Sequence, residues 1–182
     1  MVIITIYRLV EHGGFPFVQS GESSICPICS EMLTMRSWRA RMLIDSCGSK
    51  VVYQIRRLLC SKCNKIHHEL PDCMIPYKRH CTETIGKIAL GAVNSISNDA
   101  PCEENTIFRI RLWWGAVLPY FLNIMETLSQ KYRLDLNIDH QHNINPGRQL
   151  TNNYISSMRA FKKIMRAIVN SGNWISSSML CT

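Results

Sequence analysis

Two Cys-x-x-Cys pairs are the residues of this sequence with the clearest capacity for chemistry. Cys26 and Cys29 form the first pair, Cys60 and Cys63 form the second, and residues 30–59 separate them. Each pair can fold into a tight knuckle, and two knuckles brought together offer four thiolates in the tetrahedral arrangement of a structural zinc site. Because four protein ligands leave no open position for water, the sequence predicts a Zn²⁺ ion that stabilises the fold and does not catalyse.

Other residues leave alternatives open at this site. His67 or Cys73 can replace one of the four thiolates as a ligand, because imidazole and thiolate are both good zinc donors. The complete pairs make this unnecessary and favour a surface or outer-sphere role for His67. The sequence also leaves iron as an alternative to zinc. Nine cysteines would suggest disulfides in a secreted protein, whereas the two pairs favour a metal site and buried thiols in a reducing cytoplasm.

A β-hairpin explains the wide gap between the cysteine pairs. Residues 36–44 and 51–59 are strand-like runs, and the small polar residues and the glycine of 45–49 suit a turn between them. Residues 2–7 predict one further short strand, followed by a polar loop to Ser24 that delivers the first knuckle. The sequence therefore predicts a zinc ribbon with an N-terminal strand over residues 1–80.

Basic side chains are concentrated around this hairpin. The formal net charge of the chain is +8, and residues 34–80 carry ten of its Lys and Arg residues against three acidic ones. Trp38 and Tyr53 lie among the arginines, and such a mixture can bind phosphates and stack on bases. The alternative is that the aromatic rings cover a small hairpin while the arginines remain in water. The charge clustering favours a polyanion partner.

A change to helical periodicity begins at Thr82, which we expect to cap a first helix. Residues 97–101 end that helix, and Glu103 and Glu104 start a second one that Pro119 kinks or ends. Two helices joined by a short break resemble a helix-turn-helix over residues 81–133. The side facing the DNA groove would carry Asn105, Thr106, Arg109 and Trp113. A plain helical packing unit is the alternative.

The remainder of the chain predicts a linker and a last helix. Periodicity fails over 134–149, and an amphipathic helix occupies most of 151–169 within a C-terminal segment of 150–182. Its apolar seam can pack on its own domain or form a homodimer, and its basic face can contact DNA or a partner. The seam comprises Tyr154, Met158, Phe161, Met165 and Ile168. The expected fold class is α+β.

Catalysis and membrane insertion are not expected. A transposase or nuclease needs two or three carboxylates that converge on magnesium ions, and the best pair here, Asp135 and Asp139, has no third partner. No apolar run approaches the ~20 residues that cross a bilayer, and the apolar N-terminus lacks a basic leader. We therefore expect a cytoplasmic, non-enzymatic protein.

Several motifs occur together in this sequence: Cys26-Pro27-Ile28-Cys29, Ile55-Arg56-Arg57-Leu58-Leu59-Cys60-Ser61-Lys62-Cys63, His68-Glu69-Leu70-Pro71-Asp72, Pro76-Tyr77-Lys78-Arg79, Glu83-Thr84-Ile85, Cys102-Glu103-Glu104-Asn105-Thr106-Ile107, Arg109 and Trp113-Trp114. Together they resemble a bacterial family of poorly characterised zinc-ribbon proteins that are found with mobile elements and often labelled transposase-like. The resemblance covers roughly residues 20–130, and Ile110 departs from it, since a tryptophan is expected there. This resemblance implies a zinc ribbon and a helix-turn-helix that bind DNA, in transposition or its regulation.

The resulting hypothesis is a transposon-associated accessory or regulatory protein that binds DNA. The expected phosphate contacts are Arg39, Arg41, Arg56, Arg57, Lys78 and Arg79, and Thr106 and Arg109 are expected to reach bases from the second helix. One competing hypothesis is a zinc adaptor that recruits a catalytic protein through the Trp113-Trp114 region and the C-terminal seam. The other is a magnesium-dependent transposase or nuclease.

Overall fold

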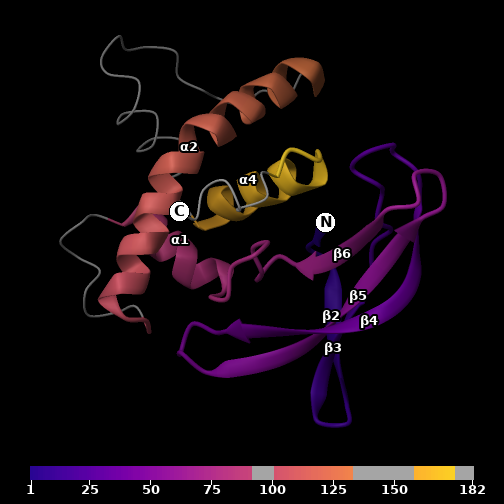
Figure 1. Cartoon of the computed structure of the whole chain (residues 1–182), viewed down its shortest axis with the longest axis horizontal. Helices are drawn as coiled ribbons and strands as arrows, with labels where there is room; N and C mark the ends of the chain where they lie inside the picture. The colour runs from indigo at the N-terminus through magenta and orange to yellow at the C-terminus, as the bar shows by residue number, and fades with distance from the viewer. Residues whose placement is uncertain (92–100, 133–157, 175–182) are drawn as a thin grey trace.

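A computed structural model describes residues 1–91, 101–132 and 158–174 (Figure 1). These residues form six β-strands and three α-helices, so the predicted α+β class is confirmed. The strands are β1 (Val2–Ile4), β2 (Tyr7–His12), β3 (Phe15–Ser20), β4 (Leu33–Ile44), β5 (Lys50–Cys60) and β6 (Ile66–Pro71). The helices are α1 (Thr82–Leu90), α2 (Glu104–Tyr132) and α4 (Met158–Asn170). None of the described helices is long and apolar enough to span a bilayer.

The sheet is built around β5. Strand β4 pairs with β5 along almost its full length, and β6 and β3 pair with different parts of the other edge of β5. The turn at residues 45–49 forms as predicted, because Asp45 accepts hydrogen bonds from the backbone N–H groups of Cys47 and Ser49 while Gly48 adopts a φ of 87°. The hairpin expected between the two cysteine pairs is thus present.

A second hairpin occupies the region predicted to be a polar loop. Strands β2 and β3 pair antiparallel from Tyr7 to Ser20 and are joined by Gly13 and Gly14, which have φ values of 60° and 77°. Two consecutive positive φ angles suit a tight two-residue hairpin turn, which glycine forms without steric cost. The prediction of a loop up to Ser24 was therefore wrong, and the Gly-Gly pair was the overlooked signal.

The N-cap of the first helix lies one residue earlier than predicted. Cys81 is the N-cap of α1, and its Sγ accepts a hydrogen bond from the backbone N–H of Thr84, whereas Thr82 is already the first helical residue. The helix ends at Leu90, and Gly91 bonds back to the carbonyl of Lys87. The helix was predicted to continue up to residues 97–101, and residues 92–100 of that stretch lie outside the described residues.

Helix α2 continues through Pro119 as a single element of 29 residues, and its axis bends along its length (Figure 1). Proline lacks the N–H that would bond to the preceding turn, which explains a kink without a break. Trp113 and Trp114 are buried, with exposed fractions of 4% and 6%. Both rings therefore belong to the hydrophobic core.

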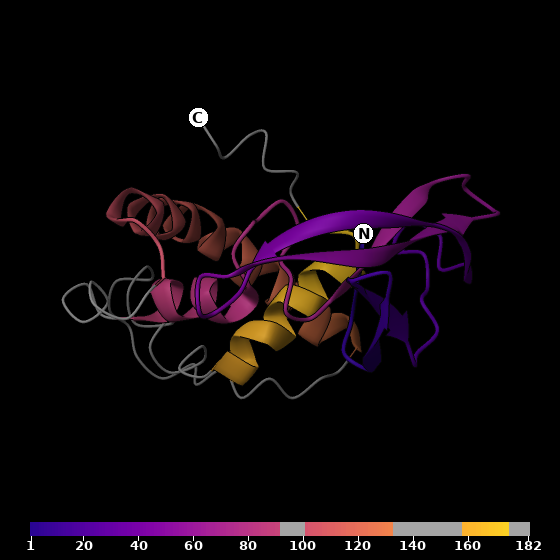
Figure 2. The same ribbon diagram turned by 90° about the horizontal axis from the view of Figure 1, so that it is seen from below.

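Helix α4 lies between the sheet and the other two helices (Figures 1 and 2). Its described apolar face, which includes Phe161, Met165 and Ile168, is buried with residues of the sheet, α1 and α2 in one cluster. The seam was predicted either to pack on its own domain or to form a homodimer, and in the structure its described part packs on the core of the chain. Tyr154 lies outside the described residues. The last strand of the sheet ends at Pro71 and α1 begins at Thr82, and the hydrophobic cluster includes residues on both sides of the predicted boundary at residue 80.

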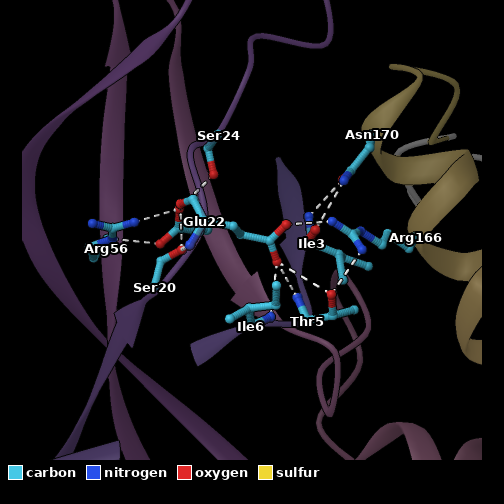
Figure 3. Close-up of polar contacts among 10 residues, drawn as sticks. Ile3, Thr5, Ile6, Ser20, Glu22, Ser24, Arg56, Arg166 and Asn170 are labelled. Carbon is cyan, nitrogen blue, oxygen red and sulfur yellow. Dashed lines mark hydrogen bonds and ion pairs between the residues drawn. The ribbon is translucent and has the colours of Figure 1, made fainter. Parts of the chain in front are cut away.

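Polar contacts fasten α4 to β1 (Figure 3). Asn170 accepts a hydrogen bond from the backbone N–H of Ile3 at 2.7 Å and donates one to its carbonyl at 3.0 Å. Arg166 donates to Glu22 at 2.5 Å, and the same carboxylate accepts from the backbone N–H of Ile6 at 3.0 Å. A second ion pair joins Lys162 to Asp72. Lys162 and Arg166 were predicted to lie on a basic face available to a partner, and these ion pairs direct both to the chain itself.

Candidate metal centre and basic sheet face

The four predicted cysteines converge. The ligand atoms of Cys26, Cys29, Cys60 and Cys63 all lie within 4.8 Å of one another. The Sγ atoms of Cys26 and Cys63 are 3.6 Å apart, and those of Cys29 and Cys60 are 3.3 Å apart. Zn–S bonds of about 2.3 Å in a tetrahedron place sulfurs about 3.8 Å apart, so the cluster has the size of a four-thiolate metal site. It is the one such group of three or more metal-ligating residues in the described chain.

The two knuckles have the same local geometry. In the first, the N–H of Cys26 donates to the carbonyl of Glu31, and in the second, the N–H of Cys60 donates to the carbonyl of Lys65. The residue after each pair, Ser30 or Asn64, has a positive φ of 60° or 53°. This conformation reverses the chain within one residue and thereby turns both thiols of each pair to the same side.

The cysteine thiols are free and partly protected from solvent. All eight cysteines in the described residues are free thiols. Cys26 and Cys60 are buried, and Cys29 and Cys63 are half-buried. A hydrogen bond from the backbone N–H of Cys63 lowers the pKa of the Cys60 thiol to about 7. The thiolate, which is the form that binds metal, is therefore accessible near neutral pH at this position.

His67 lies beside the cluster rather than in it. Its Nε2 is 3.5 Å from the Sγ of Cys26, and the residue is 4% exposed. His67 does not belong to the group of four metal-ligating cysteines, and its outer-sphere role stays a prediction. Cys73, the other candidate fourth ligand, does not belong to the metal-ligating group.

A buried ion pair lies on the same face of the sheet as the metal site. Arg56 binds both oxygens of the Glu69 carboxylate, at 2.5 and 2.8 Å, and Ser24 donates a hydrogen bond to it at 2.6 Å. The Glu69 side chain is completely buried. This placement corrects the prediction for Arg56, because its charge neutralises a buried carboxylate and is not free to contact phosphate.

The other predicted phosphate-binding residues fall into two groups. Arg41 donates to the backbone carbonyls of Ile75 and Lys78, and Lys78 lies 4.1 Å from the centre of the Trp113 ring. Both side chains therefore have structural partners. Arg39 and Arg79 are exposed, and Arg57, which is half-buried, has no ion pair in the described residues.

The helical residues expected to read bases are only partly in position. Arg109 is exposed on α2 and Thr106 is half-buried in its first turn, whereas Trp113 lies in the core and cannot face a groove. The turn that would join α1 to α2 falls in residues 92–100, outside the described residues. Asp135 and Asp139, the carboxylates of the enzyme hypothesis, also lie outside them.

The structure adds His68 and Ser37 to the residues around the arginines. Nη1 of Arg39 donates to Nε2 of His68 at 3.2 Å, and Ser37 is the direct partner of Arg57 in the β4–β5 pairing. The alternation of side chains along a strand could have identified His68 and Ser37 from the sequence. Successive strand residues point to opposite faces, so His67 and His68 lie on different faces, as do Arg56 and Arg57. The β-bulge between Met35 and Ser37 shifts that alternation along β4.

Comparison with known proteins finds a family model that matches part of the chain. Residues 26–110 match the model of a family described as a domain of unknown function (DUF6431). The matched segment begins at the first cysteine of the candidate metal centre and ends in the first turns of α2. No curated protein and no solved structure matches the chain. The fold and the site therefore define an α+β protein with a four-cysteine candidate metal centre.

Proposed function

We propose that this chain is a zinc-stabilised DNA-binding protein. The observation that carries the proposal is the division of charge across β5. On the metal side, Arg56 is neutralised by Glu69, whereas on the opposite face Arg39 and Arg57 have no carboxylate partner in the described residues. Cations that lack internal partners and lie on a rigid sheet suit the phosphate backbone of DNA.

Zinc is the metal that we assign to the centre. Four thiolates in two similar knuckles form a closed tetrahedral set, which is the usual arrangement of a structural zinc site. Both knuckles are continuous with β-strands, so a bound ion would fix the metal-side ends of β4 and β5. The role of the metal is thus to hold the arginine-bearing hairpin in one conformation, and DNA binding depends on it indirectly.

The resemblance to mobile-element proteins supports the cellular setting of the proposal. We propose an accessory or regulatory role in transposition, with a different chain providing catalysis. The adaptor alternative is less favoured, because the rings of Trp113 and Trp114 and the described seam of α4 are buried in the core.

The first experiment measures metal content. The purified protein is expected to contain about one zinc per chain, and Cys60→Ser is expected to lose it, because a four-ligand structural site rarely tolerates loss of a ligand. Cys47→Ser is the matched control, since Cys47 is exposed at the hairpin tip and outside the cluster. Zinc content that is unchanged in Cys60→Ser, or iron in place of zinc, would contradict the assignment.

The second experiment measures affinity for duplex DNA across salt concentrations. Each phosphate contact contributes about 0.9 to the slope of log affinity against log salt. We expect Arg39→Gln to reduce the magnitude of that slope by about 0.9, which is the contribution of one phosphate contact. Arg109→Gln removes an equally exposed charge from α2 and decides whether the helix also contacts DNA. Affinity that does not change with salt would exclude the DNA-binding proposal.

A further inference from the structure

Three residues form a row across β4, β5 and β6 on the face of the sheet opposite the metal side. Ser37 is paired with Arg57, and Arg57 is paired in turn with His68. Directly paired residues point to the same face, with their Cβ atoms about 5 Å apart. The side chains of Ser37, Arg57 and His68 therefore start from adjacent positions on one surface.

Arg39 completes this group from the next position of β4 on the same face. Its guanidinium reaches from β4 across β5 to the ring of His68 on β6, with the Nη1–Nε2 distance of 3.2 Å. Since arginine can only donate, Nε2 of His68 is the acceptor and the ring hydrogen lies on Nδ1. That arrangement leaves the Nδ1–H of His68 as a donor, alongside the N–H groups of two arginines.

Two polar atoms in the row are buried without partners. Within the described residues, the Oγ of Ser37 and the Nε of Arg57 are inaccessible to solvent and have no hydrogen bond in the chain. Buried polar groups in proteins are nearly always satisfied, so orphaned donors indicate a missing acceptor. Both atoms belong to the directly paired residues Ser37 and Arg57.

No carboxylate on these strands can serve as that acceptor. Glu69 is the one acidic residue in β4, β5 and β6, and it lies on the metal side with Arg56. Burial and the neighbouring Arg39 and Arg57 lower the pKa of His68 to about 4, so the ring is neutral near pH 7 and the positive charge of the row comes from the two arginines. Like charges on neighbouring arginines repel, and an oxyanion between them would offset that repulsion.

We propose that Ser37, Arg39, Arg57 and His68 form a binding site for a single phosphate group. This inference rests on the proposed DNA-binding function, in which a backbone phosphodiester occupies the site and fixes the register of the hairpin on the duplex. Arg39 and His68 bind the phosphate from the solvent side, and binding requires the side chains of Ser37 and Arg57, whose Oγ and Nε atoms are inaccessible to solvent, to open toward it. Forked guanidinium donors and a hydroxyl are the usual partners of such an oxyanion.

Inorganic phosphate is the probe that tests the site independently of DNA. In the zinc-loaded full chain, titration with phosphate is expected to shift the Arg57 Nε–Hε and His68 ring resonances in NMR spectra, with sodium chloride at matched ionic strength as the reference. Ser37→Ala and Arg57→Gln should each weaken phosphate binding at least ~5-fold, since each removes a hydrogen bond to a charged group. Shifts that sodium chloride reproduces, or that persist unchanged in Arg57→Gln, would overturn the inference.

Arg36→Gln is the matched control. Arg36 is an exposed arginine at the β-bulge, one residue before Ser37, and it has no place in the pairing of the row. Its loss removes the same formal charge, so general electrostatic attraction would fall equally in both variants. If phosphate binding weakens as much in Arg36→Gln as in Arg57→Gln, the binding comes from non-specific electrostatic attraction and the proposed site is wrong.

The DNA arm separates failure of the site from failure of the proposed function. If the wild-type chain binds duplex DNA and Arg57→Gln leaves both affinity and salt slope unchanged, DNA binding stands and the phosphate site is wrong. If phosphate binds in the row but DNA does not bind at low salt, the site stands and DNA binding is wrong, which points to a free phosphate compound as ligand. If Arg57→Gln lowers the magnitude of the slope of log DNA affinity against log salt by about one, both the phosphate site and the DNA-binding function are supported.

Discussion

Arg56 and Glu69 form an ion pair in which the carboxylate is fully buried and the guanidinium retains 22% of its side-chain exposure. Ser24, two residues before the first metal-site cysteine, donates a third hydrogen bond to the same carboxylate. The pair therefore links β5 and β6 to the segment that enters the first knuckle. Arg57, its neighbour in sequence, points to the opposite face of the sheet.

Removal of Arg56 is expected to destabilise the protein strongly. Arg56→Met would leave the Glu69 charge buried without its partner, a change that typically costs about 3–5 kcal/mol in the free energy of unfolding. Urea unfolding of the zinc-loaded chain measures this. Arg57→Gln serves as control and should cost much less, because Arg57 has no ion pair in the described residues. An equal loss of unfolding free energy in Arg56→Met and Arg57→Gln would show that the ion pair with Glu69 does not make Arg56 more important for stability than Arg57.

His67 is expected to strengthen the metal centre without binding the metal. His67→Leu would remove the contact to Cys26 Sγ, and loss of such outer-sphere partners typically lowers metal affinity by about 10–100-fold. Competition with a chelator measures the affinity, and the zinc stoichiometry should remain at one. His68→Leu, on the opposite face, should leave the affinity unchanged. Loss of all zinc from His67→Leu would instead make His67 a ligand.

Asn170 is expected to protect the edge of β1. Asn170→Ala removes two hydrogen bonds to Ile3 and should cost about 2 kcal/mol in unfolding free energy, at about 1 kcal/mol for each bond. The amide hydrogen of Ile3 should then exchange faster with solvent, which NMR can follow. Asn170→Asp is the informative comparison, because a carboxylate accepts from the N–H but cannot donate to the carbonyl. If the amide hydrogen of Ile3 exchanges at an unchanged rate in Asn170→Ala, Asn170 does not protect the edge of β1.

Glu22 should make stability sensitive to acid. Burial raises its pKa, but hydrogen bonds from the N–H groups of Ile6 and Thr5, together with Arg166, outweigh this and hold the pKa below the usual 4.5. A lowered folded-state pKa contributes stability that is complete above about pH 4.5 and disappears as the pH falls through the folded value. Glu22→Gln should therefore lose stability at pH 7 and show a smaller further loss between pH 5 and pH 3.

Urea midpoints at these three pH values provide the comparison for Glu22. Glu126→Gln is the control, because Glu126 is exposed on α2 and has no ion pair in the described residues. If Glu22→Gln and the wild type lose stability in parallel on acidification, the carboxylate is not the acid-sensitive group. The four-cysteine site is unchanged in all three proteins, so its own acid sensitivity cancels in the comparison.

Much of the site was predictable because its signals are local in sequence. The spacing within each cysteine pair determines a knuckle, and the strand-like runs around residues 45–49 determine the hairpin that brings the knuckles together. The hairpin at Gly13 and Gly14 was equally local but was overlooked. The predicted cap at Thr82 was wrong by one residue, because a cysteine thiol took the role that hydroxyl side chains usually have.

The sequence by itself determined the four-thiolate centre, the basic hairpin and the α+β class, because each depends on residue type and short-range spacing. Only the tertiary structure decided which arginines are free. Arg56 and Arg57 are chemically identical neighbours, and they differ because strand pairing places one against the buried Glu69 and the other beside Ser37 and His68. Burial of Trp113 and of the α4 seam was likewise decided by packing, since an apolar face in sequence does not state which surface covers it.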